Sequence, residues 1–305
     1  MKRTRLIPVL CLVAVALVAL RAEAKLNVIA TTPDFGALAQ EVGGDLIKVH
    51  SLALGSEDPH FVDAKPSFIR ILNQADVLIE GGAELEIGWL PPLVNNARNA
   101  KILSDAPGHV IASRGVALRE VPTQAMDRSH GDVHPLGNPH YLLDPANAKV
   151  VAATLAQTFS QLDPAHAEAF QANARRFEAR LTAKMAEWEQ ALAPFRGTPV
   201  VTYHKSFDYF LERFGFKLAG TIEPKPGIEP SPTHISALIP EAKAAGVKLV
   251  LIEPCRPRRT PQMVAKSIGA TLLVLPLMPG GHEKATDFFS WVDYNVAQLR
   301  AALKP

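Results

Sequence analysis

Apolar segments alternate with amphipathic segments along most of this 305-residue chain. Residues 26–32 (LNVIATT) form a short apolar run that fits a buried strand, and residues 33–44 (PDFGALAQEVGG) place their apolar positions at helical intervals before a terminal glycine. The pattern repeats, which predicts parallel sheets with crossover helices. The expected strands are 26–32, 47–54, 76–82, 101–105, 198–204, 247–254 and 270–277. The expected helices are 33–44, 65–75, 86–97, 145–162, 206–215, 260–269 and 287–303.

One long helix divides this series into two parts. Residues 164–192 are rich in Ala, Glu, Lys and Arg and contain neither Gly nor Pro after the first position. A helix of about 28 residues extends about 42 Å, which is more than one small domain needs. The sequence therefore predicts an α/β protein of two lobes, residues 25–163 and 197–305, joined by a linking helix within residues 164–196. Asp144, before Pro145, is expected to cap the helix that leads into this region.

The first 24 residues are typical of a secretory signal peptide. A basic start (MKRTR) precedes an apolar run of about 15 residues, and Ala22-Glu23-Ala24 fits a cleavage site. The apolar run is shorter than the ~20 residues that cross a bilayer. We therefore expect a protein exported to the periplasm without stable membrane insertion.

Removal of residues 1–24 changes the charge and the cysteine content. The whole chain has a formal net charge of +2, and this segment contributes four basic residues and one acidic residue, so the exported chain has a charge of about −1. Such a balance gives no reason to expect nucleic acid as a partner. Cys11 lies in the segment, so Cys255 is left without a partner for an intramolecular disulfide, and buried cores must stabilise the exported protein.

Three histidines lie next to the ends of expected elements. His60 follows a strand in GSEDPHF, His140 precedes the helix capped by Asp144, and His204 ends the strand TPVVTYH. Ligands of open parallel sheets bind beyond the carboxyl ends of the strands, and neutral imidazole is a favoured ligand of zinc and neighbouring transition metals. A single histidine at such a place is more often a surface or helix-cap residue; their common location makes the three a candidate metal site. The histidines interpreted as surface or cap residues are His50, His109, His166, His234 and His282.

The segments around these histidines carry a resemblance to a known family. In order, GSEDPHF, KPSFIRILNQADVLIEGGAELEIGWL, GNPHYLLDP and VTYHKSFDYFLERFG resemble the periplasmic zinc- and manganese-binding proteins of bacterial ABC importers, the cluster A-I substrate-binding family. The likeness covers nearly the whole exported chain, including the long helix. It implies two lobes bridged by a rigid helix, a metal in the cleft between them, and His60, His140 and His204 as its ligands. Manganese-preferring members tend to have glutamate in the third place, so His204 favours zinc.

The fourth ligand is left open by this resemblance. Many relatives have an aspartate shortly after the last strand, where this chain reads LPLMPGG with Pro276 near the expected position. Water could complete the site. Asp287 could also reach it, although this residue equally suits the N-cap of the last helix. Asp34, at the start of the first helix, is a further candidate with the same alternative.

A polar loop over residues 120–139 contains two more histidines. His130 and His134 are flanked by Asp127 and Asp132, and members of the family often carry a histidine- and acid-rich loop here. The loop either captures metal weakly and passes it inward, or is a solvated loop without such a role.

The resemblance implies a periplasmic solute-binding protein and not an enzyme. It would capture a divalent metal, zinc in preference to manganese, and deliver it as a monomer to a membrane permease with an ATPase. A zinc hydrolase is the alternative from another class, because three histidines and a water also form a catalytic site. The chain has no HExxH motif and no glutamate evidently placed as a general base. An adhesin or a periplasmic metal buffer would keep the fold and change the role.

Overall fold

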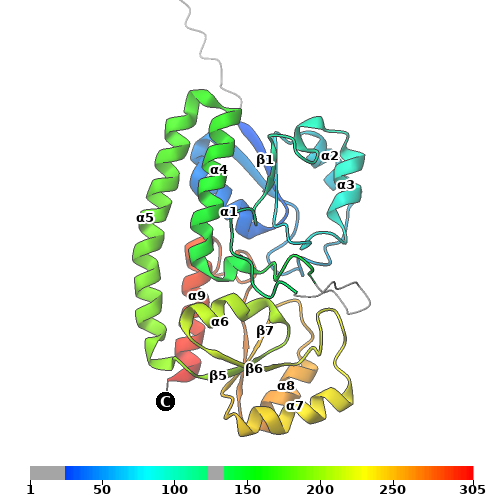
Figure 1. Ribbon diagram of the computed structural model, residues 1–305, viewed down its shortest axis with the longest axis vertical. Coiled ribbons are helices and arrows are strands. Elements are labelled where there is room, and N and C mark those ends of the chain that lie inside the picture. The colour runs from blue at the N-terminus through cyan, green and yellow to red at the C-terminus, as the bar shows by residue number, and fades with distance from the viewer. Residues whose placement is uncertain (1–24, 123–133, 305) are drawn as a thin grey trace, which may run out of the picture.

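The protein folds into two α/β lobes that lie one above the other along the longest axis (Figure 1). The computed structural model describes residues 25–122 and 134–304. The expected signal peptide and His130, with Asp127 and Asp132, lie outside these residues. Within the described part of the chain, no helix is both long and apolar enough to cross a membrane.

Each lobe contains a four-stranded parallel sheet. The N-terminal sheet consists of β1 (Leu26–Ala30), β2 (Ile47–Ser51), β3 (Val77–Glu80) and β4 (His109–Ile111), in the order β2-β1-β3-β4. The C-terminal sheet consists of β5 (Pro199–Thr202), β6 (Lys217–Thr221), β7 (Leu249–Ile252) and β8 (Thr271–Val274), in the order β6-β5-β7-β8. The two sheets thus have the same topology, and the predicted α/β class with two lobes is confirmed.

Nine α-helices connect and cover the strands in the described residues. They are α1 (Pro33–Gly43), α2 (Pro66–Asn73), α3 (Leu90–Ala97), α4 (Ala148–Leu162), α5 (Ala167–Leu192), α6 (Asp208–Phe214), α7 (Pro232–Ala244), α8 (Arg259–Ile268) and α9 (Phe288–Leu303). The long helix α5 runs along one side of both lobes (Figure 1) and contacts α1, α4 and α9. It is the linking helix that the sequence predicts.

The largest apolar core is shared by the two lobes. It runs without interruption from β1 and α1 through α4 and α5 to α6 and α9. At its centre the ring of Phe177 on α5 lies 5.5 Å from that of Phe288 and 5.4 Å from that of Phe289, both on α9. Two smaller cores lie on the outer sides of the sheets, under α2 and α3 and under α7 and α8. The linking helix is therefore packed over its length against both lobes.

Two strands differ from the sequence prediction. The prediction of a strand at 101–105 is wrong. Asn99 accepts a hydrogen bond from the Lys101 amide and starts a short 3-10 turn, Ala100–Ile102. The strand that pairs with β3 comes later, as β4. The other difference is β6, an edge strand that the sequence analysis did not include. Its side chains are exposed or half-buried, so it lacks the apolar run of a buried strand.

The lobes also meet away from α5, at a close approach of two loops. Gly55 follows β2, and a Cβ atom there would lie 2.2 Å from the carbonyl oxygen of Pro279 in the loop after β8. A distance this short excludes any side chain. The backbones of the two lobes thus touch directly on this side.

Candidate metal centre

His60 is held by the loop that follows β2. The backbone amide of His60 donates to Asp58 Oδ1 at 3.0 Å, and the indole of Trp89 donates to the carbonyl of Pro59 at 2.9 Å. The imidazole Nδ1 donates to the same Asp58 oxygen at 2.9 Å. This bond fixes the tautomer in which Nε2 carries a lone pair and faces the cleft.

His140 lies between the polar loop and α4. Its backbone amide donates to Asn138 Oδ1 at 3.0 Å, while the amide nitrogen of Asn138 donates to the carbonyl of Lys205 in the other lobe at 2.9 Å. Beyond His140, Asp144 accepts from the Ala146 amide as the sequence predicts. The carboxylate of Asp144 also takes two hydrogen bonds of 2.7 Å from Arg213 on α6. Both sides of His140 are therefore tied to the C-terminal lobe.

His204 comes two residues after β5. The parallel pairing with β6 continues past the strand ends, because the Glu223 amide donates to the Tyr203 carbonyl at 2.9 Å. This register places the Glu223 carboxylate beside the ring of His204, and Nδ1 of His204 donates to Glu223 Oε2 at 2.6 Å. His204 thus has the same arrangement as His60, with Nδ1 on a carboxylate and the lone pair on Nε2.

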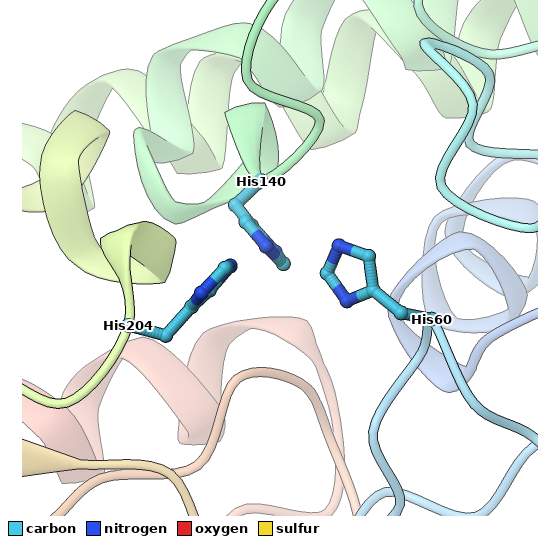
Figure 2. Close-up of side chains that lie close together, drawn as sticks. All are labelled: His60, His140 and His204. Carbon is cyan, nitrogen blue, oxygen red and sulfur yellow. The ribbon is translucent and has the colours of Figure 1, made fainter. Parts of the chain in front are cut away.

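The three rings converge from both lobes (Figure 2). The ring centroid of His60 lies 5.0 Å from that of His140 and 5.6 Å from that of His204, and those of His140 and His204 are 5.4 Å apart. All three side chains are buried, and one ring nitrogen from each lies within 4.8 Å of the others. The Nε2 atom of His140 is buried and has no hydrogen-bond partner among the described residues. An unpartnered buried nitrogen in such a cluster fits a metal ligand.

The surroundings of His140 favour its neutral form. Burial, together with His60 and His204 nearby, lowers the pKa of His140 well below its usual value. Burial alone would raise the pKa of Asp58, but the hydrogen bond with His60 and the charge of Arg256 bring it below its usual value. The centre thus combines the uncharged imidazole of His140 with a carboxylate that stays ionised, which suits a divalent cation.

His134 lies against this group on the cleft side. Its Nε2 atom is 3.0 Å from Nε2 of His60, and the ring centroids are 5.0 Å apart. Burial, with His60 and His204 nearby, lowers the pKa of His134 to about 3. With His140 and His204 it lines a cavity of about 350 Å³ that is also bordered by Glu120 and Lys205. The polar loop therefore brings a fourth imidazole to the mouth of the centre.

The two aspartates considered as fourth ligands lie outside the three-histidine group. Asp287 caps α9: its Oδ1 accepts from the amides of Phe289 and Ser290, both at 2.9 Å, in a capping box. Asp34 borders a cavity of only about 20 Å³ next to His140, and burial raises its pKa to about 6. After β8, the carbonyl of Pro276 accepts from Trp291 and Asn295, so the segment is turned toward α9.

Some residues of the centre were missed by the sequence analysis. Asp58 and Glu223 hold the two histidines, and Arg256 lies near both carboxylates. Asp58 could have been found in the DPH sequence, two residues before His60. Glu223 could not, because its position depends on β6, which the apolar pattern does not reveal.

Comparison with known proteins agrees with this geometry. Residues 28–302 match the model of the ZnuA family, described as zinc-uptake complex component A, periplasmic. The chain belongs to this family. A ZnuA-family relative, the high-affinity zinc uptake system protein ZnuA of Paracoccus denitrificans, is 29% identical over 72% of this chain and 73% of its own. The manganese ABC transporter substrate-binding lipoprotein PsaA of Streptococcus pneumoniae is 24% identical over 92% of this chain and 89% of its own.

A solved structure supports the fold. A crystal structure of ZnuA superposes with a TM-score of 0.76, at 24% identity, over 92% of this chain and all of the other. The ZnuA family comprises substrate-binding components of metal importers and is not an enzyme class. The protein is therefore a periplasmic component that captures metal for import.

Proposed function

We propose that this ZnuA-family protein binds zinc between its lobes through His60, His140 and His204 and delivers it to an ABC permease driven by an ATPase. The observation that carries the proposal is the convergence of three buried imidazoles from both lobes, with ring nitrogens within 4.8 Å. Zinc bonds to histidine nitrogen at about 2.0–2.1 Å. Small movements of the side chains are enough to bring the three nitrogens to one ion.

The donor set supports zinc over manganese. The group comprises nitrogen donors, and the carboxylates of Asp58 and Glu223 bond to Nδ1 atoms instead of facing the centre. Imidazole suits zinc, whereas manganese prefers carboxylate, carbonyl and water oxygen. Zinc is therefore the expected cargo, and a competition titration with both metals measures the preference.

His134 is proposed as the fourth nitrogen, supplied by the polar loop. Its Nε2 atom lies against Nε2 of His60 at a distance close to the edge of a zinc tetrahedron, about 3.3 Å for bonds of this length. At this position the ring of His134 can meet zinc at the mouth of the centre. The His134→Ala variant is expected to weaken zinc binding and leave the stoichiometry at one ion.

The centre lacks the features of a hydrolase. Glu223 is buried and committed to His204 and to the amide of Gly227, so it is not placed to activate a water. Hydrolysis of ester, phosphoester or peptide substrates that disappears in His204→Ala would contradict the transport proposal.

The central experiment is elemental analysis of protein purified without added metal. The wild type is expected to carry one zinc, and the triple variant His60→Ala, His140→Ala, His204→Ala none. His50→Ala is the matched control, since His50 is exposed on β2. Circular dichroism of the metal-free proteins verifies folding. Zinc retained by a folded triple variant would overturn the assignment.

A further inference from the structure

One arginine lies between the carboxylates that hold His60 and His204. Arg256 follows β7, and its side chain is 15% exposed. Its Nη2 atom is 3.2 Å from Asp58 Oδ2 in the N-terminal lobe, and its Nη1 atom is 4.0 Å from Glu223 Oε1 in the C-terminal lobe. The neighbouring residues Arg258 and Arg259 are exposed. Arg256 thus differs from both in pointing inward, across the cleft.

The contacts form a chain from one metal-binding histidine to another. His60 Nδ1 bonds to Oδ1 of Asp58, and Arg256 pairs with the other oxygen, Oδ2. On the far side, His204 Nδ1 bonds to Oε2 of Glu223, and Arg256 faces the other oxygen, Oε1. Asp58 therefore divides its two oxygens between His60 and the guanidinium, whereas Oε1 of Glu223 accepts from the Gly227 amide at 3.1 Å and meets the guanidinium as a longer ion pair. The chain thus spans both lobes, with a close contact to Asp58 and a longer approach to Glu223.

The geometry requires arginine in particular. A guanidinium presents donors in a planar fork, so two of its nitrogens can face two carboxylates, whereas a lysine ammonium is a point charge on a flexible stem. The guanidinium carbon lies 5.3 Å from the ring centroid of Tyr203, which supports its plane. A third carboxylate, the fully buried Glu253, lies 3.9 Å from Nε. Within the part of the chain that the structure describes, Oε2 of Glu253 and Nε of Arg256 have no hydrogen-bond partner.

We propose that Arg256 is a positioning residue that joins the ligand-holding carboxylates of the two lobes and so sets His60 and His204 at the spacing that binds the metal. The proposal rests on the proposed function. Arg256 contacts the histidines through Asp58 and Glu223, and acts on the metal through them.

The sign of the effect separates positioning from simple charge. A positive side chain close to a divalent cation repels it, so if Arg256 acted by charge alone, its removal would tighten binding. If Arg256 positions the histidines, its removal loosens binding, and loss of such an outer partner costs about 10–100-fold in metal affinity. The two effects have opposite directions in the same measurement.

The test is zinc affinity of the full exported protein, measured by competition with a chelator. Arg256→Gln is expected to bind zinc at least about tenfold more weakly than wild type, and Arg256→Lys, which keeps the charge but not the fork, to recover only part of the loss. Arg258→Gln is the matched control and is expected to match wild type. Far-UV circular dichroism and the melting midpoint of the metal-free variants report folding. Equal or tighter binding by Arg256→Gln, or full recovery by Arg256→Lys, would overturn the proposal.

A double-mutant cycle tests whether Arg256 acts through Asp58. Asp58→Asn and Arg256→Gln are expected to be non-additive, so the double variant loses little more affinity than the worse single variant. Additive losses would show that Arg256 acts by another route. Failure of the proposed function gives a different result: the wild type would not bind zinc, or the triple histidine variant would bind it equally well.

Discussion

His60 in the N-terminal lobe and His204 in the C-terminal lobe are oriented in the same way. Each directs Nδ1 to a carboxylate, and each keeps Nε2 for the centre of the cleft. A histidine side chain can rotate and can carry its proton on either nitrogen, so an isolated ring specifies little. The hydrogen bond to the carboxylate fixes both the ring orientation and the tautomer, and it increases the basicity of the ligand nitrogen. At the scale of single residues, we therefore expect the affinity of the proposed site to depend on Asp58 and Glu223 as well as on the histidines.

Replacing Glu223 tests this dependence. Glu223→Gln keeps the size of the side chain and removes its charge, so the ring of His204 is held less firmly in the required tautomer. We expect zinc affinity to fall by about 10–100-fold with one zinc still bound per molecule, measured by chelator competition. Glu229→Gln, an exposed change in the same loop, is the control and should leave affinity unchanged. An unchanged affinity in Glu223→Gln would contradict the role of this carboxylate.

The candidate site could be predicted from the sequence only as far as the histidines. His60, His140 and His204 lie at ends of expected elements, and the family resemblance names them. Their partners could not be predicted, since an ordinary acidic residue becomes a histidine partner only through the register of neighbouring strands. Arg256 likewise stands among other arginines in CRPRR, and nothing in that pattern marks which one turns inward.

At the scale of elements, the start of α9 contains Asp287, which the sequence allowed to be either a metal ligand or a helix cap. Asp287 was a candidate ligand and a candidate cap, and its carboxylate caps two backbone amides. Asp287→Ala is therefore expected to lower the free energy of unfolding by about 0.5–2 kcal/mol and to leave zinc affinity unchanged. Denaturant unfolding and chelator competition measure the two quantities, and Asp287→Ser, which retains a capping oxygen, is the control. A large loss of affinity in Asp287→Ala would restore it as a ligand.

The turn after β3 contains a buried acid that links stability to pH. Glu86 accepts hydrogen bonds from the Thr31 hydroxyl at 2.6 Å and the Gly81 amide at 2.7 Å, and burial raises its pKa to about 8 from 4.5. A group with a raised folded-state pKa binds its proton more tightly in the folded state. Its contribution to stability is complete below pH 4.5 and is lost as pH rises toward 8.

Glu86→Gln removes this titration. We expect the wild type to lose stability relative to Glu86→Gln between pH 5 and pH 8, by on the order of a few kcal/mol, as measured by urea unfolding of the metal-free proteins. Glu189→Gln, an exposed change on α5, should follow the wild type at every pH. A constant difference between wild type and Glu86→Gln across this range would show that Glu86 is ionised when folded.

Most elements of the fold could be predicted, because their apolar patterns are created by burial. Helix α5 has six buried apolar residues on one side of a long run without glycine or proline, and its prediction is confirmed. The pattern fails for β4 and β6. β4 is only three residues long, and β6 is a half-exposed edge strand. Neither strand therefore has a run of buried apolar residues that the sequence pattern could reveal.

At the scale of the whole molecule, the shared core limits how far the lobes can separate. The core continues from β1 through α5 to α9, and Gly55 meets the Pro279 carbonyl on another side of the interface. Wide opening would expose these apolar side chains to water at about 25 cal/mol per Å². Zinc-free and zinc-bound protein are therefore expected to give nearly superimposable small-angle scattering curves, with any change confined to small tilts and loop movements. A clear increase in the radius of gyration without zinc would contradict this.

The continuous core has a consequence for the unloading of the cargo. A carrier whose two lobes separate widely can release its ion by thermal motion alone. In this protein, wide separation would expose the shared apolar core to water. For the proposed site, release is therefore expected to begin locally, at the cavity lined by His134 and Lys205. The proposed permease partner would then act at that rim, while the two lobes stay together.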